Sequence, residues 1–503
     1  MSIPILELKD INKSFNGHRV LCDIDLKINC GEVLCLVGEN GSGKSTLIKI
    51  ISGVYKPDSG SVFFNGSCFS KLDPVISIKQ GVQVIYQDFS IFPNLSVAEN
   101  ISLGMQLVNN KKFLNWKNIK KMAQKALDII GVSMDLNEEV WRLPVSQKQI
   151  IAICRSILQE AKIIIMDEPT TALTNKEIER LYEIIRELAA RGMAVVFVSH
   201  KLDEIFSVCD RITVLRNGKI VKDEYSNKFD KENLTYYMTG EHIAESPFNY
   251  VPISQEPIFQ VKNLCKKGFF NDISFNVYPG EILGITGQLG CGRTELAKAL
   301  FGIEKIDDGQ IIVHGENQYF KSIEDAKRVR IAYVPEDRLS EGLFMQRSLK
   351  DNFSSTTIDR KKKKSGLVDF SKVLDEAIFR INELNINAND VRSLASTFSG
   401  GNQQRIVIGK WLATNPEILI LNGPTVGVDI KSKSEIHKIL KELAKKGMCV
   451  IMISDDIGEL ISTTNRVLVM NQGNIIFERE TSEIDVEVLN KKILQDLKED
   501  KNK

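Results

Sequence analysis

The sequence lacks the features that would mark a membrane or secreted protein. Among its 503 residues there is no uninterrupted apolar run of about 18 residues, so we expect no helix that crosses a membrane. The opening residues, MSIPILELKD, lack a basic region followed by an apolar one, so we expect no secretory signal. Any role at a membrane should therefore come through partner subunits.

Charge excess and cysteine pairs are also missing. The formal net charge is +1, so bulk charge favours neither nucleic acid nor an anionic membrane surface as a partner. The nine cysteines are scattered, mostly inside apolar runs, without a CxxC pair. This pattern indicates reduced core cysteines in a cytosolic protein and disfavours a zinc site. At 43% hydrophobic and 26% charged residues, the composition is that of an ordinary soluble protein with two or three domains.

What the sequence does contain is one domain written twice. GEVLCLVGENGSGKST starts at Gly31 and GEILGITGQLGCGRTE starts at Gly280, an offset of 249 residues (280 minus 31). Further along, IIIMDEPT and ILILNGPT place Asp167 and Asn422 at an offset of 255 (422 minus 167). The repeat predicts two homologous halves, which sets the architecture.

The boundaries follow from the repeat and from local composition. We predict domains at 3–240 and 257–490, a polar, proline-bearing linker at 241–256, and a frayed tail at 491–503. The basic stretch 360–364 is interpreted as a solvated loop. Apolar strand-like runs alternate with helical stretches in each half, which predicts buried parallel strands and an α/β, RecA-like P-loop core.

A phosphate-binding motif follows the strand VLCLV in the first half. The run GENGSGKS satisfies G-x-x-x-x-G-K-[ST], in which backbone N–H groups and a helix N-terminus converge on phosphate oxygens. Lys44 is expected to reach the β- and γ-phosphates and Ser45 to ligate Mg²⁺. The motif therefore predicts ATP and Mg²⁺ as cofactors. The residues expected to hold the nucleotide here are Gly38, Asn40, Gly41, Gly43, Lys44, Ser45 and Thr46.

Two later strands end in residues that suit hydrolysis. Asp167 ends KIIIMD and is expected to hold Mg²⁺, while Glu168 beside it is the candidate to polarise the attacking water. His200 ends VVFVSH, where it could touch the γ-phosphate or the water. The carboxyl ends of strands are where α/β proteins place their sites.

These motifs, in this order, resemble the ATP-binding cassette family of transport ATPases over nearly the whole chain. The resemblance implies that Gln87 senses Mg²⁺ and contacts the membrane subunit, that Phe15 stacks on adenine, and that Thr170 to Thr174 form the loop after the catalytic glutamate. It also implies a helical subdomain that carries a signature sequence in each half.

In this family two cassettes pair head to tail, and the signature of one closes the nucleotide site of the other. The second half carries a good signature, FSGGNQQ, and the first half a poor one, LPVSQ at 143–147. Pro144 lacks a hydroxyl and an N–H, and Val145 puts a branched side chain where Gly is wanted. The residues expected to face the nucleotide from the second half are Ser399, Gly400, Gly401 and Gln403.

The second half's own nucleotide residues are altered. Asn422 and Gly423 replace the carboxylates, and Arg293 replaces Lys44, a bulkier cation that does not substitute freely for it. Glu336 stands in place of Gln87, and Asp455 in place of His200. Under the cross-pairing all these defects fall on one site. We therefore predict one hydrolytic site and one binding or structural site.

The second half is further similar to the ATPase subunit of bacterial monosaccharide importers of the ribose, galactose and xylose type. Its run GQLGCGRTEL and the strings YVPEDR and FSGGNQQ carry this resemblance, while Asn422, Gly423 and Pro144 depart from it. The resemblance implies two permease subunits and an extracytoplasmic solute-binding protein as partners. It places the chain at the cytoplasmic face of the membrane.

Three alternatives stay open at this stage. A nucleoside or other small-solute importer would use a similar tandem subunit. A ribosome-binding tandem translation factor would usually carry a long charged linker and two intact sites. A DNA-repair cassette ATPase would carry CxxC pairs, which this sequence lacks.

Overall fold

The computed structural model describes residues 3–69, 72–86, 91–108, 115–170, 173, 175–199, 201–242, 248, 254–288, 290–363, 365–388 and 390–494. The chain divides into two compact units, 1–243 and 244–503, and this division lies inside the predicted linker. Within the residues described, no helix combines the length and apolar character that crossing a membrane requires.

The first unit has a small antiparallel sheet in the order β2-β1-β4-β5 and a larger sheet in the order β10-β9-β3-β8-β7-β6. In the larger sheet β9, β3, β8, β7 and β6 run parallel, and β10 is an antiparallel edge. The strands of the first unit are Leu6–Phe15 (β1), His18–Ile28 (β2), Val33–Val37 (β3), Ser59–Phe64 (β4), Ser67–Phe69 (β5), Val82–Ile85 (β6), Ile163–Asp167 (β7), Ala194–Val198 (β8), Arg211–Arg216 (β9) and Lys219–Tyr225 (β10).

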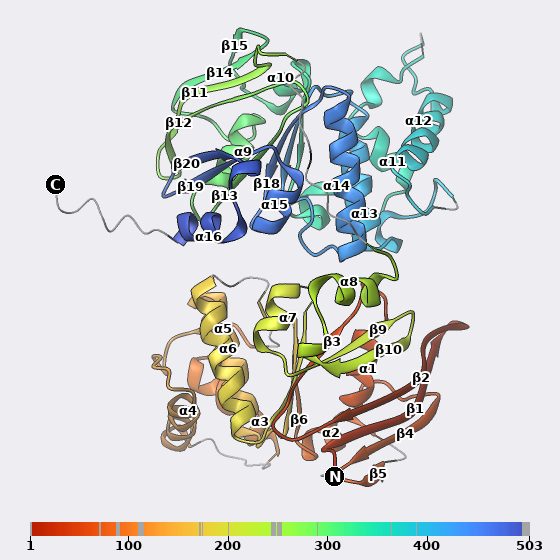
Figure 1. Cartoon of the computed structure of the whole chain (residues 1–503), viewed down its shortest axis with the longest axis vertical. Helices are drawn as coiled ribbons and strands as arrows, with labels where there is room; N and C mark the ends of the chain where they lie inside the picture. Colours follow the sequence, from red (N-terminus) through yellow and green to blue (C-terminus); the bar gives the residue numbers. More distant parts are fainter. Residues whose placement is uncertain are drawn as a thin grey trace, which may run out of the picture. The chain divides into compact units, whose positions relative to one another are not determined.

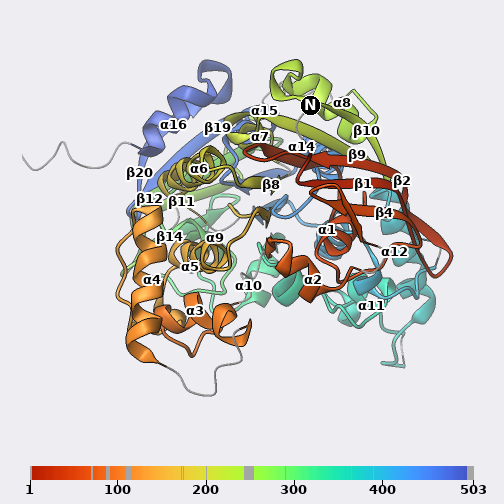
Figure 2. The same ribbon diagram turned by 90° about the horizontal axis from the view of Figure 1, so that it is seen from below.

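The helices of the first unit fall into those that flank the sheet and those that form a separate helical part. Helices α3, α4 and α5 pack on one another and form this part. Figures 1 and 2 both show α4 on the opposite side of the unit from β1 and β2. The helices are Lys44–Ile51 (α1), Pro74–Lys79 (α2), Val97–Val108 (α3), Trp116–Ile130 (α4), Val145–Leu158 (α5), Asn175–Ala190 (α6), Leu202–Val208 (α7) and Lys231–Thr239 (α8), with short turns at Val140–Arg142 (η1) and Ser226–Lys228 (η2).

The second unit repeats this plan. Its sheets have the orders β12-β11-β14-β15 and β16-β17-β18-β13-β19-β20, and α11, α12 and α13 form the helical part. Its strands are Phe259–Lys266 (β11), Phe270–Val277 (β12), Ile282–Gly287 (β13), Asp308–Val313 (β14), Glu316–Gln318 (β15), Ile331–Val334 (β16), Ile418–Asn422 (β17), Cys449–Ile453 (β18), Arg466–Asn471 (β19) and Asn474–Glu480 (β20). Its helices are Arg293–Leu300 (α9), Ile323–Arg328 (α10), Leu349–Ser354 (α11), Phe370–Glu383 (α12), Gly400–Leu412 (α13), Ile430–Lys445 (α14), Ile457–Thr463 (α15) and Val486–Leu494 (α16), with turns at Arg338–Gly342 (η3), Ile358–Arg360 (η4), Ala395–Thr397 (η5) and Thr481–Glu483 (η6).

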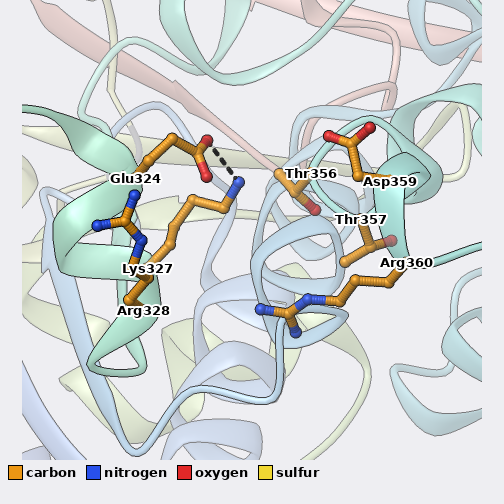
Figure 3. A pocket seen from close by; sticks show the side chains of 7 residues that line it. All are labelled: Glu324, Lys327, Arg328, Thr356, Thr357, Asp359 and Arg360. Carbon is orange, nitrogen blue, oxygen red and sulfur yellow. Dashed lines mark hydrogen bonds and ion pairs between the residues drawn. The ribbon is translucent and has the colours of Figure 1, made fainter.

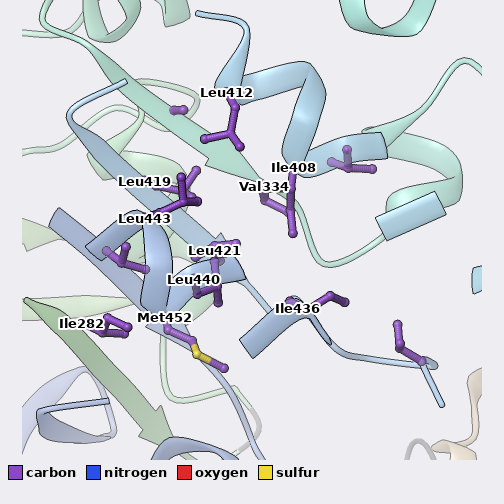
Figure 4. Packing of buried hydrophobic residues seen from close by; sticks show 14 of the residues in the cluster. Ile282, Val334, Ile408, Leu412, Leu419, Leu421, Ile436, Leu440, Leu443 and Met452 are labelled. Carbon is purple, nitrogen blue, oxygen red and sulfur yellow. The ribbon is translucent and has the colours of Figure 1, made fainter. Parts of the chain in front are cut away.

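Hydrophobic pattern explains these elements. The strands VLCLV of β3 and AVVFV of β8 are buried along their whole length, as expected for parallel strands covered on both faces. Helix α4 buries a stripe at helical spacing and ends at Gly131 in the left-handed conformation, a common helix stop. In the second unit Val334, Leu421 and Met452 of the sheet pack with Ile436 and Leu440 of α14 (Figure 4). The predicted α/β architecture with two tandem P-loop domains is confirmed.

The structure differs from the sequence predictions at two places in the second unit. Helix α16 runs to Leu494, past the predicted limit of 490, because Leu489 and Ile493 are buried against the core. The prediction of a solvated loop at 360–364 is wrong at Lys361, which is only 8% exposed. Its ammonium group is buried among packed elements, and burial lowers the pKa of Lys361.

A pocket beside this stretch lies between α10 and η4 (Figure 3). Its cations already have partners. The Lys327 ammonium lies 2.8 Å from Glu324, and the Arg360 guanidinium donates to the Thr414 carbonyl at 3.2 Å. The pocket is therefore of mixed charge and offers no basic patch for an anionic ligand.

Candidate functional site

The site in the first unit begins with the loop between β3 and α1. Gly38 has φ +152°, and a Cβ there would lie 2.1 Å from the Leu215 carbonyl oxygen, so only glycine fits. Lys44 begins α1, and its ammonium donates to the carbonyl oxygens of Gly38 at 2.7 Å and Glu39 at 2.9 Å. The loop thus carries a fixed cation over its own backbone.

Space remains open above this loop. A Cβ built on Gly41 would meet no heavy atom within 4 Å. Asn40 and Ser45 are exposed, and Thr46 is half-buried at the first turn of α1. The unbonded N–H groups at the start of a helix favour an anion at this place. The predicted phosphate-binding residues are therefore brought together around one accessible cradle.

Asp167 ends β7, and its surroundings favour a cation. Burial raises the pKa of Asp167, the adjacent Glu168 adds to the rise, and the charges of Lys44 and Lys49 partly offset it. A divalent cation near this carboxylate would stabilise its ionised form. Lys44, the Ser45 hydroxyl and Asp167 together supply the donor types that Mg²⁺-ATP requires, so the residues present fit the expected cofactor.

Glu168 has a strained backbone. Its φ is +48°, in the left-handed region that residues other than glycine rarely adopt, and its N–H donates to the Val198 carbonyl at 2.9 Å. Such a conformation costs a residue other than glycine about 1–3 kcal/mol. The bond to Val198 fixes this backbone against the end of β8, next to the strand that leads to position 200.

Of the other site residues predicted in the first unit, the structure describes Phe15. Phe15 ends β1, is 38% exposed, and packs edge-on against Tyr55 with ring centroids 5.2 Å apart. The Lys13 ammonium also lies over this ring, 5.3 Å from its centroid. Gln87 and His200 lie outside the described residues, as do positions 171, 172 and 174 of the loop after Glu168.

The second unit builds the same loop with different chemistry. Arg293 begins α9 and donates to the Gly287 carbonyl at 2.8 Å, as Lys44 does to Gly38. Its guanidinium also forms an ion pair with Asp455. The residues at the positions of Lys44 and His200 therefore pair with each other. The cation that would face phosphate is already neutralised.

The ends of β7 and β17 differ as well. Asn422 is buried, and its amide donates to the Thr294 hydroxyl at 3.4 Å. Gly423 has φ +57°, close to that of Glu168, and its N–H donates to the Ile453 carbonyl at 2.9 Å. The backbone frame is thus kept. The second unit lacks both carboxylates and relieves the strain with glycine.

The two signature segments also share a backbone and differ in side chains. Ser399 caps α13 with φ −63° and ψ 158°, and its hydroxyl accepts from the Asn402 side-chain amide at 3.1 Å. Pro144 precedes α5 with φ −63° and ψ 160° and makes no side-chain cap. Gln403 is buried and its amide donates to the Phe398 carbonyl at 3.0 Å, which holds the turn before Ser399.

Comparison with known proteins agrees with this geometry. The family model described as ABC transporter matches residues 21–171 and again residues 270–426.

The chain belongs to the ABC transporter family.

Several relatives share its full length. Ribose import ATP-binding protein RbsA of Oceanobacillus iheyensis is 37% identical over 471 residues, 93% of this chain and 94% of that protein. The proteins of the same name from Caldanaerobacter subterraneus and Bacillus cereus are 38% and 39% identical over 94% and 93% of this chain, and 96% and 95% of their own lengths. The solved ADP conformation of an ATP-binding cassette is 26% identical, with a TM-score of 0.42 over 47% of this chain and 99% of that one.

These findings confirm the predicted resemblance to tandem ATP-binding cassette subunits of sugar importers. Sequence reasoning missed two side chains of the site region. Glu204 is a buried carboxylate behind β7 and β8, and Arg338 is a guanidinium between η3 and the loop after β17. Alignment of the two halves pairs Glu204 with Glu459, and this repeated glutamate was the signal in the sequence that could have identified Glu204.

Proposed function

We propose that the chain is the ATPase subunit of an ABC importer for ribose or a closely similar sugar, and that it hydrolyses ATP at the site of the first unit. One observation carries this proposal. The first unit holds Lys44, Ser45, Asp167 and Glu168 at one sheet edge, whereas the second replaces the lysine and both carboxylates. Full-length similarity to ribose import ATP-binding proteins supports the substrate class.

In this proposal each side chain has one task. Lys44 binds the β- and γ-phosphates, Ser45, Asp167 and Gln87 hold Mg²⁺, and Phe15 stacks on the adenine. Glu168 orients and polarises the water, and His200 contacts the γ-phosphate or that water. Bound Mg²⁺ supplies positive charge to the phosphates. The left-handed backbone of Glu168, held by the bond from its N–H to the Val198 carbonyl, is in keeping with this role.

The proposal also gives the second unit a task. Ser399, Gly400 and Gly401 close the nucleotide held by the first unit, and the second unit's own loop does not hydrolyse. The capped, ordered start of α13 supports this role, because its hydroxyl and N–H groups are arranged for an anion. Gln403 assists by holding the turn.

Attachment to the membrane uses equivalent loops of the two units. Phe92 is 50% exposed and Phe344 is 57% exposed. Each is held by a buried asparagine: Phe92 N–H donates to the Asn100 side-chain oxygen at 2.9 Å, and Phe344 N–H to that of Asn352 at 2.9 Å. Rigid exposed phenylalanines suit contact with permease subunits at the cytoplasmic membrane face. The complex would contain two permeases and an extracytoplasmic solute-binding protein.

Arg338 gives the second of these loops a mechanical connection. Its guanidinium donates to the carbonyl oxygens of Val426 at 2.7 Å and Gly427 at 3.3 Å. A Cβ added to Gly400 would lie 2.9 Å from the same guanidinium. A shift of the loop that carries Phe344 would therefore be transmitted to the start of α13, which carries the signature.

The proposed function is tested by measuring sugar uptake in cells whose own copy of this chain is replaced by a Lys44→Ala variant. We expect ATP-dependent uptake of labelled ribose to fall to background, because the variant loses nucleotide binding and turnover. Lys298→Ala, which removes a partly exposed cation on α9, is the matched control and should transport normally. Uptake of a nucleoside but not of ribose by the wild-type complex would overturn the substrate class. Lys44-independent uptake would overturn the ATPase role.

A further inference from the structure

Behind the strand ends of each unit lies a buried carboxylate that belongs to neither the phosphate loop nor the metal ligands. In the first unit it is Glu204 on α7, only 6% exposed. It accepts a hydrogen bond from the Thr170 hydroxyl at 2.6 Å and another from the Ser199 hydroxyl at 2.7 Å. The Lys201 ammonium lies 3.1 Å away. One carboxylate thus bridges the segments that follow β7 and β8.

The two hydroxyls that bond to Glu204 lie close in sequence to the proposed catalytic residues. Thr170 comes two residues after Glu168 and is 3% exposed. Ser199 directly follows β8, is also 3% exposed, and accepts from the Lys201 N–H at 3.1 Å. The contacts therefore bracket position 200 on both sides and anchor the loop of Glu168. Both proposed catalytic side chains stand within two residues of a group that Glu204 holds.

The second unit contains the same bridge. Glu459 is 2% exposed and accepts from the Thr425 hydroxyl at 2.6 Å and the Ser454 hydroxyl at 2.5 Å. Burial raises the pKa of Glu459, but the charge of Lys433 and the hydrogen bond from His437 outweigh burial and bring it to about 2. The carboxylate is therefore ionised and can accept both hydroxyls.

A buried carboxylate is costly unless its hydrogen bonds are satisfied. In the second unit His437 Nε2 donates to the ionised Glu459 at 2.7 Å and shares in satisfying it. In the first unit Tyr182 stands at the aligned position. Burial and then the charge of Glu204 raise the pKa of Tyr182. The third partner of Glu204 is the Lys201 ammonium at 3.1 Å, which itself lies in the segment after β8, so the first bridge is made by the two loop segments themselves.

We propose that Glu204 is a positioning residue for ATP hydrolysis, whose carboxylate holds Thr170, two residues after Glu168, and Ser199, directly after β8, in fixed relation to each other. Glu459 keeps only the structural part of this role, because the loops it joins carry Gly423 and Asp455. This inference rests on the proposed ATPase function of the first unit.

Matched substitutions separate positioning from folding. Glu204→Gln keeps the shape but removes one of two acceptors, so one loop loses its tether. We expect kcat for ATP in the assembled complex to fall about tenfold or more, with KM for ATP within about twofold, because small displacements of catalytic groups act on turnover. Glu459→Gln should lower the melting temperature about as much as Glu204→Gln does. It should nevertheless keep at least about half of the wild-type kcat.

Thr170→Val and Ser199→Ala provide milder variants should Glu204→Gln fold poorly. Each should lower kcat in the same direction, and each combined with Glu204→Gln should lower it by less than the product of the single effects. Equal loss of kcat in Glu204→Gln and Glu459→Gln, or unchanged kcat in well-folded Glu204→Gln, would overturn the inference. Absence of any Lys44-dependent ATPase in the wild type would instead overturn the proposed function.

Discussion

The two phosphate loops of this protein share a backbone but differ in the cation they carry and in its surroundings. The Lys44 ammonium donates to the backbone carbonyls of Gly38 and Glu39 at 2.7 and 2.9 Å. Arg293 holds the equivalent carbonyl but also pairs with the carboxylate of Asp455. The carboxylate of Asp455 reduces the attraction of the Arg293 guanidinium for phosphate.

Under the proposed function, the second unit keeps the fold of the loop without its hydrolytic groups. The sequence suggests separate defects, a bulkier cation at position 293 and a negative charge at position 455. In the structure these two compensate each other. Similarly, Gly423 adopts the left-handed backbone that Glu168 adopts under strain, with the same hydrogen bond to the next strand. The second loop is thus a stable structure in its own right rather than a damaged copy of the first.

The largest expected effect concerns Glu168. Glu168→Gln should still bind ATP, because Lys44 and the loop are untouched, but its turnover should fall about 10²-fold or more, since a positioned base is lost. Steady-state ATPase and ATP binding of the assembled complex measure the two parts. Near-normal ATPase in this variant would show that the two loops differ for another reason.

The next effect concerns the signatures. Ser399→Arg should reduce turnover at least about tenfold while initial nucleotide binding stays nearly normal, because it blocks the segment proposed to close the first site. Pro144→Arg has the same bulk and charge and the same starting backbone, so it is the matched control. It should be much milder. Equal damage from both changes would contradict the asymmetric pairing of the two units.

A smaller effect is expected at the docking loops. Phe92→Asp and Phe344→Asp each place a charge on an exposed ring position without disturbing Asn100 or Asn352. We expect weaker membrane association, lower uptake and ATPase that no longer responds to substrate. Tyr225→Asp, which changes another exposed aromatic of the first unit at the end of β10, serves as a control and should behave as wild type. Unchanged association and uptake in both docking variants would remove these loops from the interface.

The smallest effect is expected from restoring the missing carboxylates. In a Glu168→Gln background, Asn422→Asp with Gly423→Glu should leave ATPase at background. A Cβ at Gly423 would lie 2.9 Å from a Val426 methyl group, and Arg293 would remain paired with Asp455. Groups that act as a unit recover little when only some are restored.

Adding Arg293→Lys and Asp455→His to that variant sharpens the comparison. We expect a measurable but small gain in ATP binding, because the ion pair between positions 293 and 455 is removed. Pro144 remains, and so does the crowding of any side chain at position 423 against Val426. Recovery of near wild-type ATPase with the two carboxylates alone would show that the altered loop had kept its catalytic capacity.

Much of this protein could be predicted from its sequence because the repeat supplies an internal comparison. The apolar runs predict the parallel strands, and GENGSGKS followed by a strand ending in Asp167 predicts the phosphate loop, since few other backbones place these groups together. The asymmetry between Asp167–Glu168 and Asn422–Gly423 is visible in the letters alone. The pattern of charged residues predicted less well which side chains are exposed. Lys361 lies in a basic run but is buried, because its position against α12 outweighs the local composition.

Pairings between distant side chains were decided only by the tertiary structure. Nothing in the sequence joins Arg293 to Asp455, or Glu204 to both Thr170 and Ser199, since these residues belong to separate helices and loops that meet only when parallel strands align at one edge. The strain at Glu168 likewise depends on its bond to Val198 on the neighbouring strand. Sequence determined which groups are present. The packing of the sheet decided which of them neutralise, tether or expose one another, because hydrogen bonds and ion pairs depend on distances of a few ångströms that strand order alone sets.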